Sequence, residues 1–265
     1  MTRPVPLPRP RLLPRLLPRL LLLPSMLRRA GHGISRLVLC VALGTGAAAA
    51  QAQGPAPTSA EVARYFRAVQ LDDVGTVSKM LATTINPNQV NPIGGEPGLV
   101  LAMREGSMKV FDVLLAQPTL KLDAPAINGN TALMMAAYQH NGAAVATLLA
   151  RGAVVAQPGW TALHYAAAAG DDAIVKQLLQ HGAPIDAASP RASGSFTALM
   201  MAAREGHDRT VNVLLAAGAD AALRNGEGLT AVDIAERADK AGIAAAIRAK
   251  LAARAIHPTP AAPSQ

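Results

Sequence analysis

The sequence predicts an all-α fold in which about six helix-turn-helix units stack in a row as a solenoid. Two observations support this prediction: a short segment recurs along the chain, and an apolar anchor follows each copy at a fixed distance. The composition agrees, since 51% of the residues are apolar but only 3% are aromatic, and small side chains suit closely packed helices. A single helical pair cannot bury its own apolar face, so each pair must stack on its neighbours.

The N-terminal segment has the pattern of a secretory signal peptide. Residues 1–25 are a low-complexity extension rich in Leu, Pro and Arg, where the prolines exclude a continuous helix. After Met26, arginines precede an apolar stretch at 37–50, and Ala50-Gln51-Ala52 follows as a cleavage motif. We expect cleavage after Ala52, with translation starting at Met1 or at Met26.

Export implies a periplasmic or secreted protein. The apolar stretch has 14 residues, fewer than the roughly 20 that a membrane-spanning helix needs. We therefore expect no membrane association after cleavage. Residues 53–60 are predicted to be a linker and residues 255–265 a flexible tail.

The charge distribution argues against a nucleic-acid partner. The net charge of +8 comes from eight arginines that precede residue 53, whereas all 17 acidic residues follow it. The remaining body carries 17 basic and 17 acidic residues and is neutral, so it has no general field that attracts phosphate backbones.

The recurring segment defines the repeats. Its copies are Thr-Ala-Leu-Met-Met-Ala-Ala at 131 and 197, Thr-Ala-Leu-His-Tyr-Ala-Ala at 161, and Thr-Ala-Val-Asp-Ile-Ala at 230. An apolar anchor lies 17 residues after each threonine: Leu148, Leu178, Leu214 and Ile247. With two degenerate copies upstream, residues 61–254 divide into six units at about 63–96, 97–130, 131–160, 161–196, 197–229 and 230–254.

Each unit has the start and stop signals of two short helices. The threonine is a good N-cap for the first helix, and Gly170 or Gly206 ends it. The second helix repeats its apolar residues at helical spacing, as in Val175, Leu178 and Leu179. A glycine such as Gly182 follows, where a left-handed backbone is needed.

This pattern resembles the ankyrin repeat, whose usual form begins Thr-Pro-Leu-His and has a period of about 33 residues. Alanine replaces the proline here, only His164 keeps the histidine, the third unit is short, and the fourth carries an insertion at 189–194. The resemblance implies an L-shaped stack with hairpin-like loops on one edge. It also implies a concave face, formed by the first helices, that binds other proteins.

The signal-peptide pattern and the resemblance together predict an exported, bacterial ankyrin-repeat module, and the resemblance implies that it binds a protein or peptide along its concave face. We expect a monomer without cofactors. A structural or antitoxin/immunity-like envelope protein is the alternative. Enzymatic activity is not expected, because the body has no cysteine, no gathered histidines, and no nucleophile, carboxylate-pair or phosphate-loop arrangement. At its family position His164 is expected to hydrogen-bond within and between loops.

The candidate binding residues surround the start of each repeat. The residue before each threonine is expected at a loop tip that faces the groove, and these residues are Asn130, Trp160, Phe196 and Leu229. Tyr138, Tyr165 and Arg204 are expected on the same face. Exposed aromatic side chains are typical binding anchors. The alternative is that Trp160 and Phe196 fold inward as packing, and the sequence does not decide between the two.

Overall fold

The computed structural model describes residues 56–256, which lie within one compact unit, Ala52–Gln265. The predicted signal peptide, its cleavage site and residues 257–265 of the predicted tail lie outside the described residues. No helix among residues 56–256 is long and apolar enough to cross a membrane.

The described chain is all-helical, as predicted, and contains twelve α-helices and one short 3-10 helix. Residues 56–256 contain no strand; only an isolated antiparallel bridge joins Val90 and Pro97. The helices form six consecutive pairs: α1 Ser59–Gln70 with α2 Val74–Thr83, α3 Gly98–Glu105 with α4 Met108–Leu115, α5 Ala132–Tyr138 with α6 Gly142–Ala150, α7 Ala162–Ala169 with α8 Asp172–Gln180, α9 Ala198–Glu205 with α10 Asp208–Ala216, and α11 Ala231–Arg237 with α12 Ala241–Ile256.

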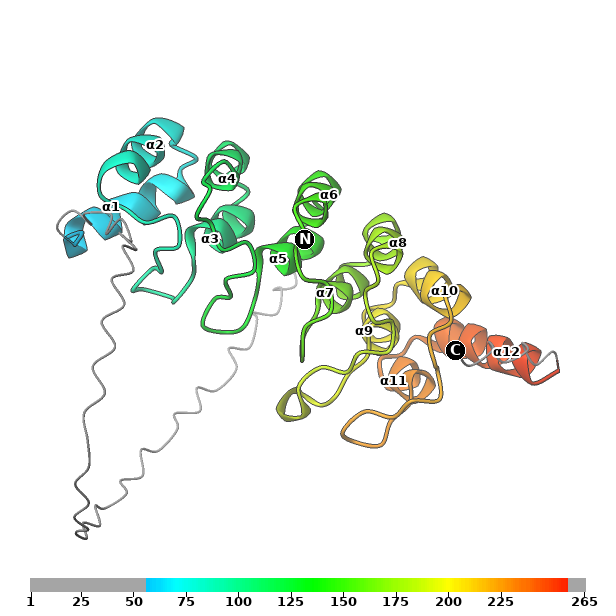
Figure 1. The fold of residues 1–265 in the computed structure, drawn as a ribbon. Helices are drawn as coiled ribbons and strands as arrows, with labels where there is room; N and C mark the ends of the chain where they lie inside the picture. Colours follow the sequence, from blue (N-terminus) through cyan, green and yellow to red (C-terminus); the bar gives the residue numbers. More distant parts are fainter. Residues whose placement is uncertain (1–55, 257–265) are drawn as a thin grey trace, which may run out of the picture. The chain divides into compact units, whose positions relative to one another are not determined.

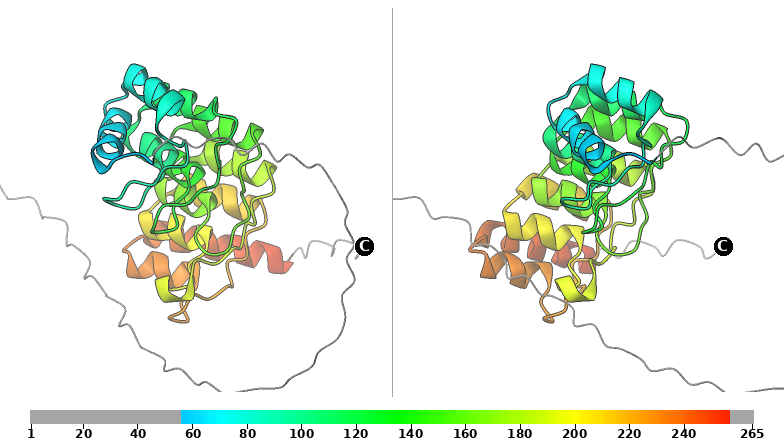
Figure 2. Two further views of the ribbon diagram at one scale, coloured as in Figure 1. Left: turned by 60° about the vertical axis from the view of Figure 1, so that its left-hand side comes forward. Right: turned by 90° about the vertical axis from the view of Figure 1, so that its left-hand side faces the viewer.

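The helices lie in two rows, which Figure 1 shows nearly end-on. The first helix of each pair packs on the first helix of the next, so α1, α3, α5, α7, α9 and α11 form an inner row. The second helices form an outer row beside it. The long loops leave the inner row on one common side. The longest helix, α12, ends the stack and projects past its neighbours (Figure 2).

The repeat threonines cap the inner helices, as the sequence predicts. Thr131, Thr161, Thr197 and Thr230 are the N-caps of α5, α7, α9 and α11. The side chain three residues later reaches back to the backbone N–H of the threonine, which completes a reciprocal cap. This return contact is made by methionine in two copies, by histidine in one and by aspartate in one: Met134, Met200, His164 and Asp233.

The predicted anchors form the core. Leu148, Leu178, Leu214 and Ile247 are each fully buried, and alanines of the inner helices fill the space between them. The predicted first unit uses Val77 and Met80 in the same way. Each unit thus buries its apolar face against its neighbours, as a linear stack requires.

Glycine is required where an inner helix ends against the next unit. Gly170 ends α7 with φ +77°, and a Cβ there would lie 2.5 Å from Nδ1 of His207. The His207 ring crosses this gap and its Nε2 donates to the Ala168 carbonyl at 2.9 Å. The absence of a side chain at Gly170 therefore allows two units to approach closely.

The two ends of the helical region extend beyond the predicted boundaries. The first helix starts at Ser59, inside the predicted linker, because Thr58 caps it and exchanges hydrogen bonds with Glu61. The last helix continues to Ile256, inside the predicted tail. The insertion of the fourth unit forms the 3-10 helix Arg191–Ser193 in the loop between α8 and α9.

Candidate functional site

The seven predicted binding residues lie together along the inner row. Asn130, Trp160, Phe196 and Leu229 precede the capping threonines of α5, α7, α9 and α11. Tyr138 ends α5, Tyr165 is in the middle of α7, and Arg204 is near the end of α9. Because the inner helices pack side by side, residues from three or four units meet on one surface.

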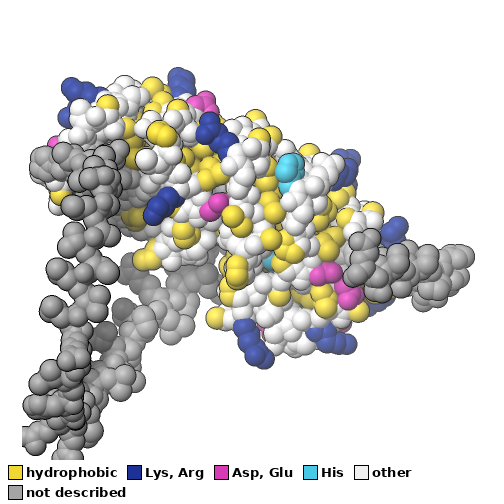
Figure 3. Space-filling view, in the orientation of Figure 1, with side chains coloured by type: hydrophobic (Ala, Val, Ile, Leu, Met, Phe, Trp, Pro, Cys, Tyr) yellow, Lys and Arg dark blue, Asp and Glu magenta, His cyan; other side chains and the backbone are white. Residues whose placement is uncertain are grey.

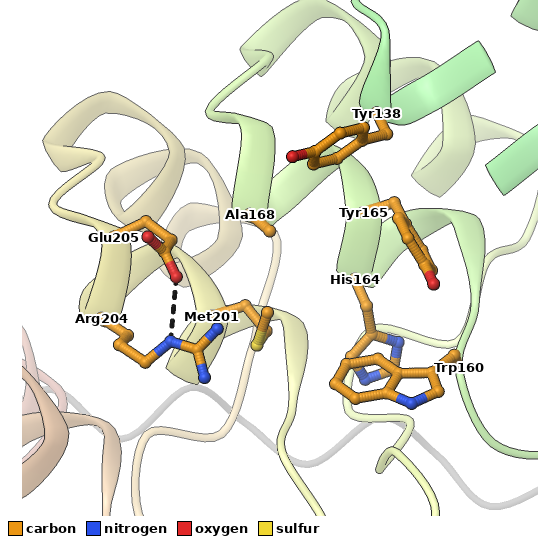
Figure 4. A pocket seen from close by; sticks show the side chains of 8 residues that line it. All are labelled: Tyr138, Trp160, His164, Tyr165, Ala168, Met201, Arg204 and Glu205. Carbon is orange, nitrogen blue, oxygen red and sulfur yellow. Dashed lines mark hydrogen bonds and ion pairs between the residues drawn. The ribbon is translucent and has the colours of Figure 1, made fainter. Parts of the chain in front are cut away.

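Six of these residues line two neighbouring pockets. The first, called here the Trp160 pocket, has a volume of about 310 Å³ and is shown in Figure 4. It is lined by Tyr138, Trp160, His164, Tyr165, Ala168, Met201, Arg204 and Glu205. Its walls therefore come from α5, the base of the loop before α7, α7 itself and α9.

The second pocket, called here the Leu229 pocket, has a volume of about 260 Å³ and lies between α9 and α11. It is lined by Phe196, Arg204, Asn225, Glu227, Leu229, Ile234, Arg237 and Ala238. Arg204 lines both pockets, so the two pockets adjoin at this residue along the inner row.

Aromatic side chains hold one another in the Trp160 pocket. The Trp160 ring meets the His164 ring edge-on with centroids 5.3 Å apart, and the Tyr165 ring at 6.3 Å. Tyr165 in turn meets Tyr138 at 6.1 Å, again edge-on. Tyr138 is the outermost member, with 53% of its surface exposed. Edge-to-face contacts of this kind fix the rings while leaving apolar surface open to a partner.

The predicted residue Asn130 contacts a pocket residue, Tyr165, but lines neither pocket itself. Its Oδ1 accepts a hydrogen bond from the Tyr165 hydroxyl at 2.6 Å, which ties the loop before α5 to α7. Burial raises the pKa of Tyr165, so the hydroxyl stays protonated and keeps donating at neutral pH. Asn130 therefore positions Tyr165 and does not line either pocket.

Arg204 is held in a defined orientation between the pockets. Its Nε donates to Oε1 of Glu205 at 2.9 Å, and its guanidinium carbon lies 5.3 Å from the centroid of the Phe196 ring. A guanidinium over an aromatic face is attracted by the ring quadrupole. Arg204 is therefore oriented before any partner binds.

His164 is a structural residue, as expected from its family position. Its Nδ1 accepts hydrogen bonds from the backbone N–H and the hydroxyl of Thr161, at 3.2 and 2.9 Å. Its Nε2 donates to the Phe196 carbonyl at 2.9 Å and so links the loop before α9 to α7. Burial lowers the pKa of His164, which keeps the ring neutral and suits this donor–acceptor pattern.

The loop positions differ from the prediction in one respect. The four residues before the threonines lie at the bases of the loops and not at their tips, because each directly precedes a helix cap. In the loops before α5, α9 and α11 the backbone carbonyl of that residue also closes a turn, as in the hydrogen bonds from Ala126 N to Asn130 O and from Asn225 N to Leu229 O.

Trp160 and Phe196 are neither fully exposed nor folded into the core. Both are half-buried and pack against it on one side. The Phe196 ring closely approaches Gly194, where a Cβ would lie 2.7 Å from the ring, so the glycine allows the ring to fold over the loop. Both alternatives left open by the sequence therefore hold in part.

Nine of the fifteen residues that line the two pockets were not predicted as binding residues. Met201 and Glu205 lie on the face of α9 that turns to the Trp160 pocket, whereas Asn225 and Arg237 line the Leu229 pocket. Met201 could have been found from the sequence, because it is three residues before the predicted Arg204 and so lies on the same face of the helix. Nothing in the sequence marks Asn225 beyond its place in an Asn-Gly turn.

The described residues offer no evident metal centre. Among residues 56–256 no group of three or more His, Cys, Asp or Glu side chains lies close enough to hold an ion. On the face drawn in Figure 3, Lys and Arg side chains and Asp and Glu side chains are scattered singly or in small groups. The two pockets themselves are lined by apolar side chains and a few polar groups.

Comparisons with known proteins agree with the fold. A family model described as "Ankyrin repeats (3 copies)" matches residues 154–225, and one described as "Ankyrin repeat" matches residues 128–158. Residues 128–225 are therefore ankyrin repeats, and the described chain is an all-α ankyrin-repeat solenoid, as the sequence predicted. Ankyrin repeats are generally protein–protein interaction modules, and proteins built from them are typically not enzymes.

Two curated proteins are similar to part of the chain. The chain is 33% identical over 165 residues to "SH3 and multiple ankyrin repeat domains protein 2" of Homo sapiens. It is 38% identical over 104 residues to "Ankyrin repeat and KH domain-containing protein mask" of Drosophila melanogaster. These matches cover 61% and 38% of this chain but only 9% and 3% of the two relatives. The likeness therefore concerns the repeats and not the whole relatives.

Proposed function

We propose that the protein binds a protein or peptide partner along the Trp160 and Leu229 pockets, acting as a monomer and without enzymatic activity. The observation that carries this proposal is the pair of pockets that adjoin at Arg204. Aromatic walls and an oriented arginine from α5, α7, α9 and α11 line two adjoining pockets. Tyrosine, tryptophan and arginine are the residues most enriched at the energetic centres of protein interfaces.

The two pockets suit an extended segment better than an isolated small molecule. They lie on successive units and share Arg204, so a ligand that fills both must run along the row of inner helices. Each pocket is at or below the smaller end of the volume range of drug-sized ligand sites. Side chains of one bound segment fit this arrangement.

Export to the periplasm or outside the cell is part of the same proposal. It is supported by the basic residues, the apolar stretch at 37–50 and the Ala50-Gln51-Ala52 motif. Mass spectrometry of the protein recovered from the envelope fraction tests it. A mature chain that begins at Gln53 is the expected result, and an intact N-terminus on protein found only in the cytoplasm contradicts it.

The binding proposal is tested by capture from envelope extract. The double variant Trp160→Ala plus Phe196→Ala is expected to lose captured partners that the original protein retains. Because both rings are half-buried, thermal unfolding of the variant must be measured in parallel. A second pair, Tyr138→Ser plus Arg204→Gln, changes two exposed side chains of the same site and preserves the core.

The matched control is Leu71→Ala, which removes an apolar side chain that is 67% exposed at the end of α1, outside both pockets. It is expected to leave capture unchanged. If both double variants capture the same proteins as the original chain, the proposed location of the site is wrong.

A further inference from the structure

The polar groups of the site indicate the chemistry of the partner, given the proposed function. Arg204 is the only residue shared by the two pockets in the described part of the chain. Its Nε is engaged with Glu205, but its two terminal nitrogens make no hydrogen bond to any described residue. Figure 4 shows these nitrogens directed into the Trp160 pocket, opposite the indole ring. Four N–H donors of Arg204 thus point into the Trp160 pocket.

Asn225 adds an independent observation in the Leu229 pocket. Its side chain is only 7% exposed. Its Oδ1 accepts hydrogen bonds from the backbone N–H groups of Glu227 and Leu229, both at 2.9 Å, so the orientation of the amide is fixed. Its Nδ2 is buried and has no hydrogen-bond partner among the described residues. Buried donors in native proteins are nearly always paired, so Nδ2 is an unsatisfied donor at the wall of the Leu229 pocket.

Arg237 completes the set of donors. It lines the Leu229 pocket beside Asn225 and pairs with Glu227 through Nη1 alone. The two acidic residues of the pockets, Glu205 and Glu227, are thus each paired with an arginine, and each pair still has free N–H groups. The indole N–H of Trp160 also has no hydrogen-bond acceptor among the described residues. Donors outnumber free acceptors, so the site favours a partner that brings acceptor oxygens.

We propose that the site recognises an acidic side chain within an extended peptide, with the carboxylate at Arg204 and an adjacent apolar side chain in the Trp160 pocket. A guanidinium presents its N–H groups as a planar fork that matches a carboxylate. The contact of Arg204 with Phe196 preorients this fork. Asn225 and Arg237 donate to the acidic residue or to the next main-chain carbonyl.

An internal acidic residue fits better than a free C-terminus. The pockets continue on both sides of Arg204, towards α7 in one direction and towards α11 in the other. A chain that ended at Arg204 would leave one of them empty. A basic side chain is disfavoured, because it would face Arg204 and Arg237, and an arginine already engages one oxygen of Glu205 and one of Glu227.

Short peptide pools with blocked ends test the proposal. Their central residue is Asp, Asn or Lys, and their other positions are mixed. Retention on the immobilised purified protein is measured by mass spectrometry. The Asp pool is expected to be retained about ten-fold more than the Asn pool, the scale of a hydrogen-bonded charge pair. Apolar residues should be enriched beside the Asp, and the emission of Trp160, the single tryptophan, should change on binding.

Three variants make the test specific. Arg204→Gln is expected to bring the Asp-to-Asn ratio to about one, and Arg204→Lys, which keeps the charge but loses the fork, to reduce it. Asn225→Asp keeps the acceptor for both backbone N–H groups and removes the free donor, so it should weaken retention of the Asp pool. The control Arg209→Gln makes the same charge change at an exposed position of α10, outside both pockets, and should preserve the ratio.

Equal retention of the Asp and Asn pools overturns the acidic assignment, as does a preference that survives Arg204→Gln. A further pool with a neutral central residue and a free C-terminal acid tests the internal position, which is wrong if this pool is retained and the blocked Asp pool is not. If neutral or Lys pools bind and alter Trp160 emission, the proposed function stands and only the acidic assignment fails. If no pool is retained above an unrelated immobilised protein, peptide binding at this site fails as well.

Discussion

Two turns of the protein have the same pattern of backbone hydrogen bonds but carry different side chains. The turn Ala126–Asn130 precedes α5 and the turn Asn225–Leu229 precedes α11, and the hydrogen bond from the first N–H to the last carbonyl is 2.8 Å in one and 2.9 Å in the other. Each also donates one N–H to the preceding loop, from Ile127 to Gly95 O at 2.9 Å and from Gly226 to Gly194 O at 2.8 Å.

The side chains on these frameworks are different. The first turn exposes an apolar side chain at its tip, Ile127, which is 86% exposed, and has a polar residue, Asn130, at its base. The second has glycine at its tip, apolar Leu229 at its base and a buried asparagine with a free donor. A turn therefore contributes to a pocket through the residues at its base, because the base lies against the inner helices.

The largest expected effect comes from breaking the packing beneath the two turns. Leu148 is the fully buried anchor of the unit that follows the first turn, and Ile247 is that of the unit that follows the second. Truncation of either to alanine should cost about 2–5 kcal/mol, since both leave a cavity. Leu148→Ala should lower the stability of the interior of the stack, whereas Ile247→Ala should loosen mainly α11, α12 and the second turn. Hydrogen exchange resolved by peptide checks this difference.

The control for both truncations is Leu71→Ala, whose exposed side chain should change stability by no more than about 0.5 kcal/mol. If Ile247→Ala speeds exchange equally in all units, the stack unfolds as one cooperative body and the two turns do not differ in local stability.

Acidification is expected to destabilise the second turn and not the first, by less than the core truncations do. The second turn bonds to a loop that His164 holds through the Phe196 carbonyl. In the unit after the first turn the same repeat position is Met134, which caps Thr131 and does not titrate. Burial lowers the pKa of His164 in the folded state below its ordinary value of 6.5. This stabilisation is present above pH 6.5 and is lost as pH falls from there towards the folded-state pKa.

The measurement is thermal unfolding from pH 7.5 to 5. The slope from a single site cannot exceed about 1.4 kcal/mol per pH unit. His164→Gln should flatten the curve, whereas His181→Gln, an exposed C-cap of α8, should leave it unchanged. The carboxyl groups with lowered pKa, Asp73 and Asp233 among them, lose their contribution only below about pH 4 and so lie outside this window. An unchanged slope in His164→Gln would refute the assignment to this ring.

The framework could be predicted from the sequence because it rests on local signals. The threonine caps, the glycine stops and anchors such as Leu178 follow from helix chemistry and from the period of the repeat, and all three are where the sequence places them. The gathering of Tyr138, Trp160, Tyr165 and Arg204 followed from the resemblance, since equivalent positions of stacked units lie side by side.

The orientation of the loop side chains could not be predicted in this way. Phe196 is half-buried because Gly194 leaves room for its ring and because His164, from the neighbouring unit, binds its carbonyl. The free donor of Asn225 exists only because both neighbouring N–H groups occupy its oxygen. Both features depend on distances between residues of different units or on the shape of one turn, and periodicity carries no information on either.

The smallest expected effect tests the comparison most directly. Ile127→Ala removes an exposed side chain from the tip of the first turn and should change stability by no more than about 0.5 kcal/mol, with capture of partners unchanged. Leu229→Ala removes a half-buried side chain from the base of the second turn, where it lines a pocket, and should weaken capture. Both changes leave the backbone hydrogen bonds of their turns in place. If Ile127→Ala abolishes capture and Leu229→Ala does not, the loop tips carry the binding, as the sequence alone suggested, and the pockets at the loop bases do not.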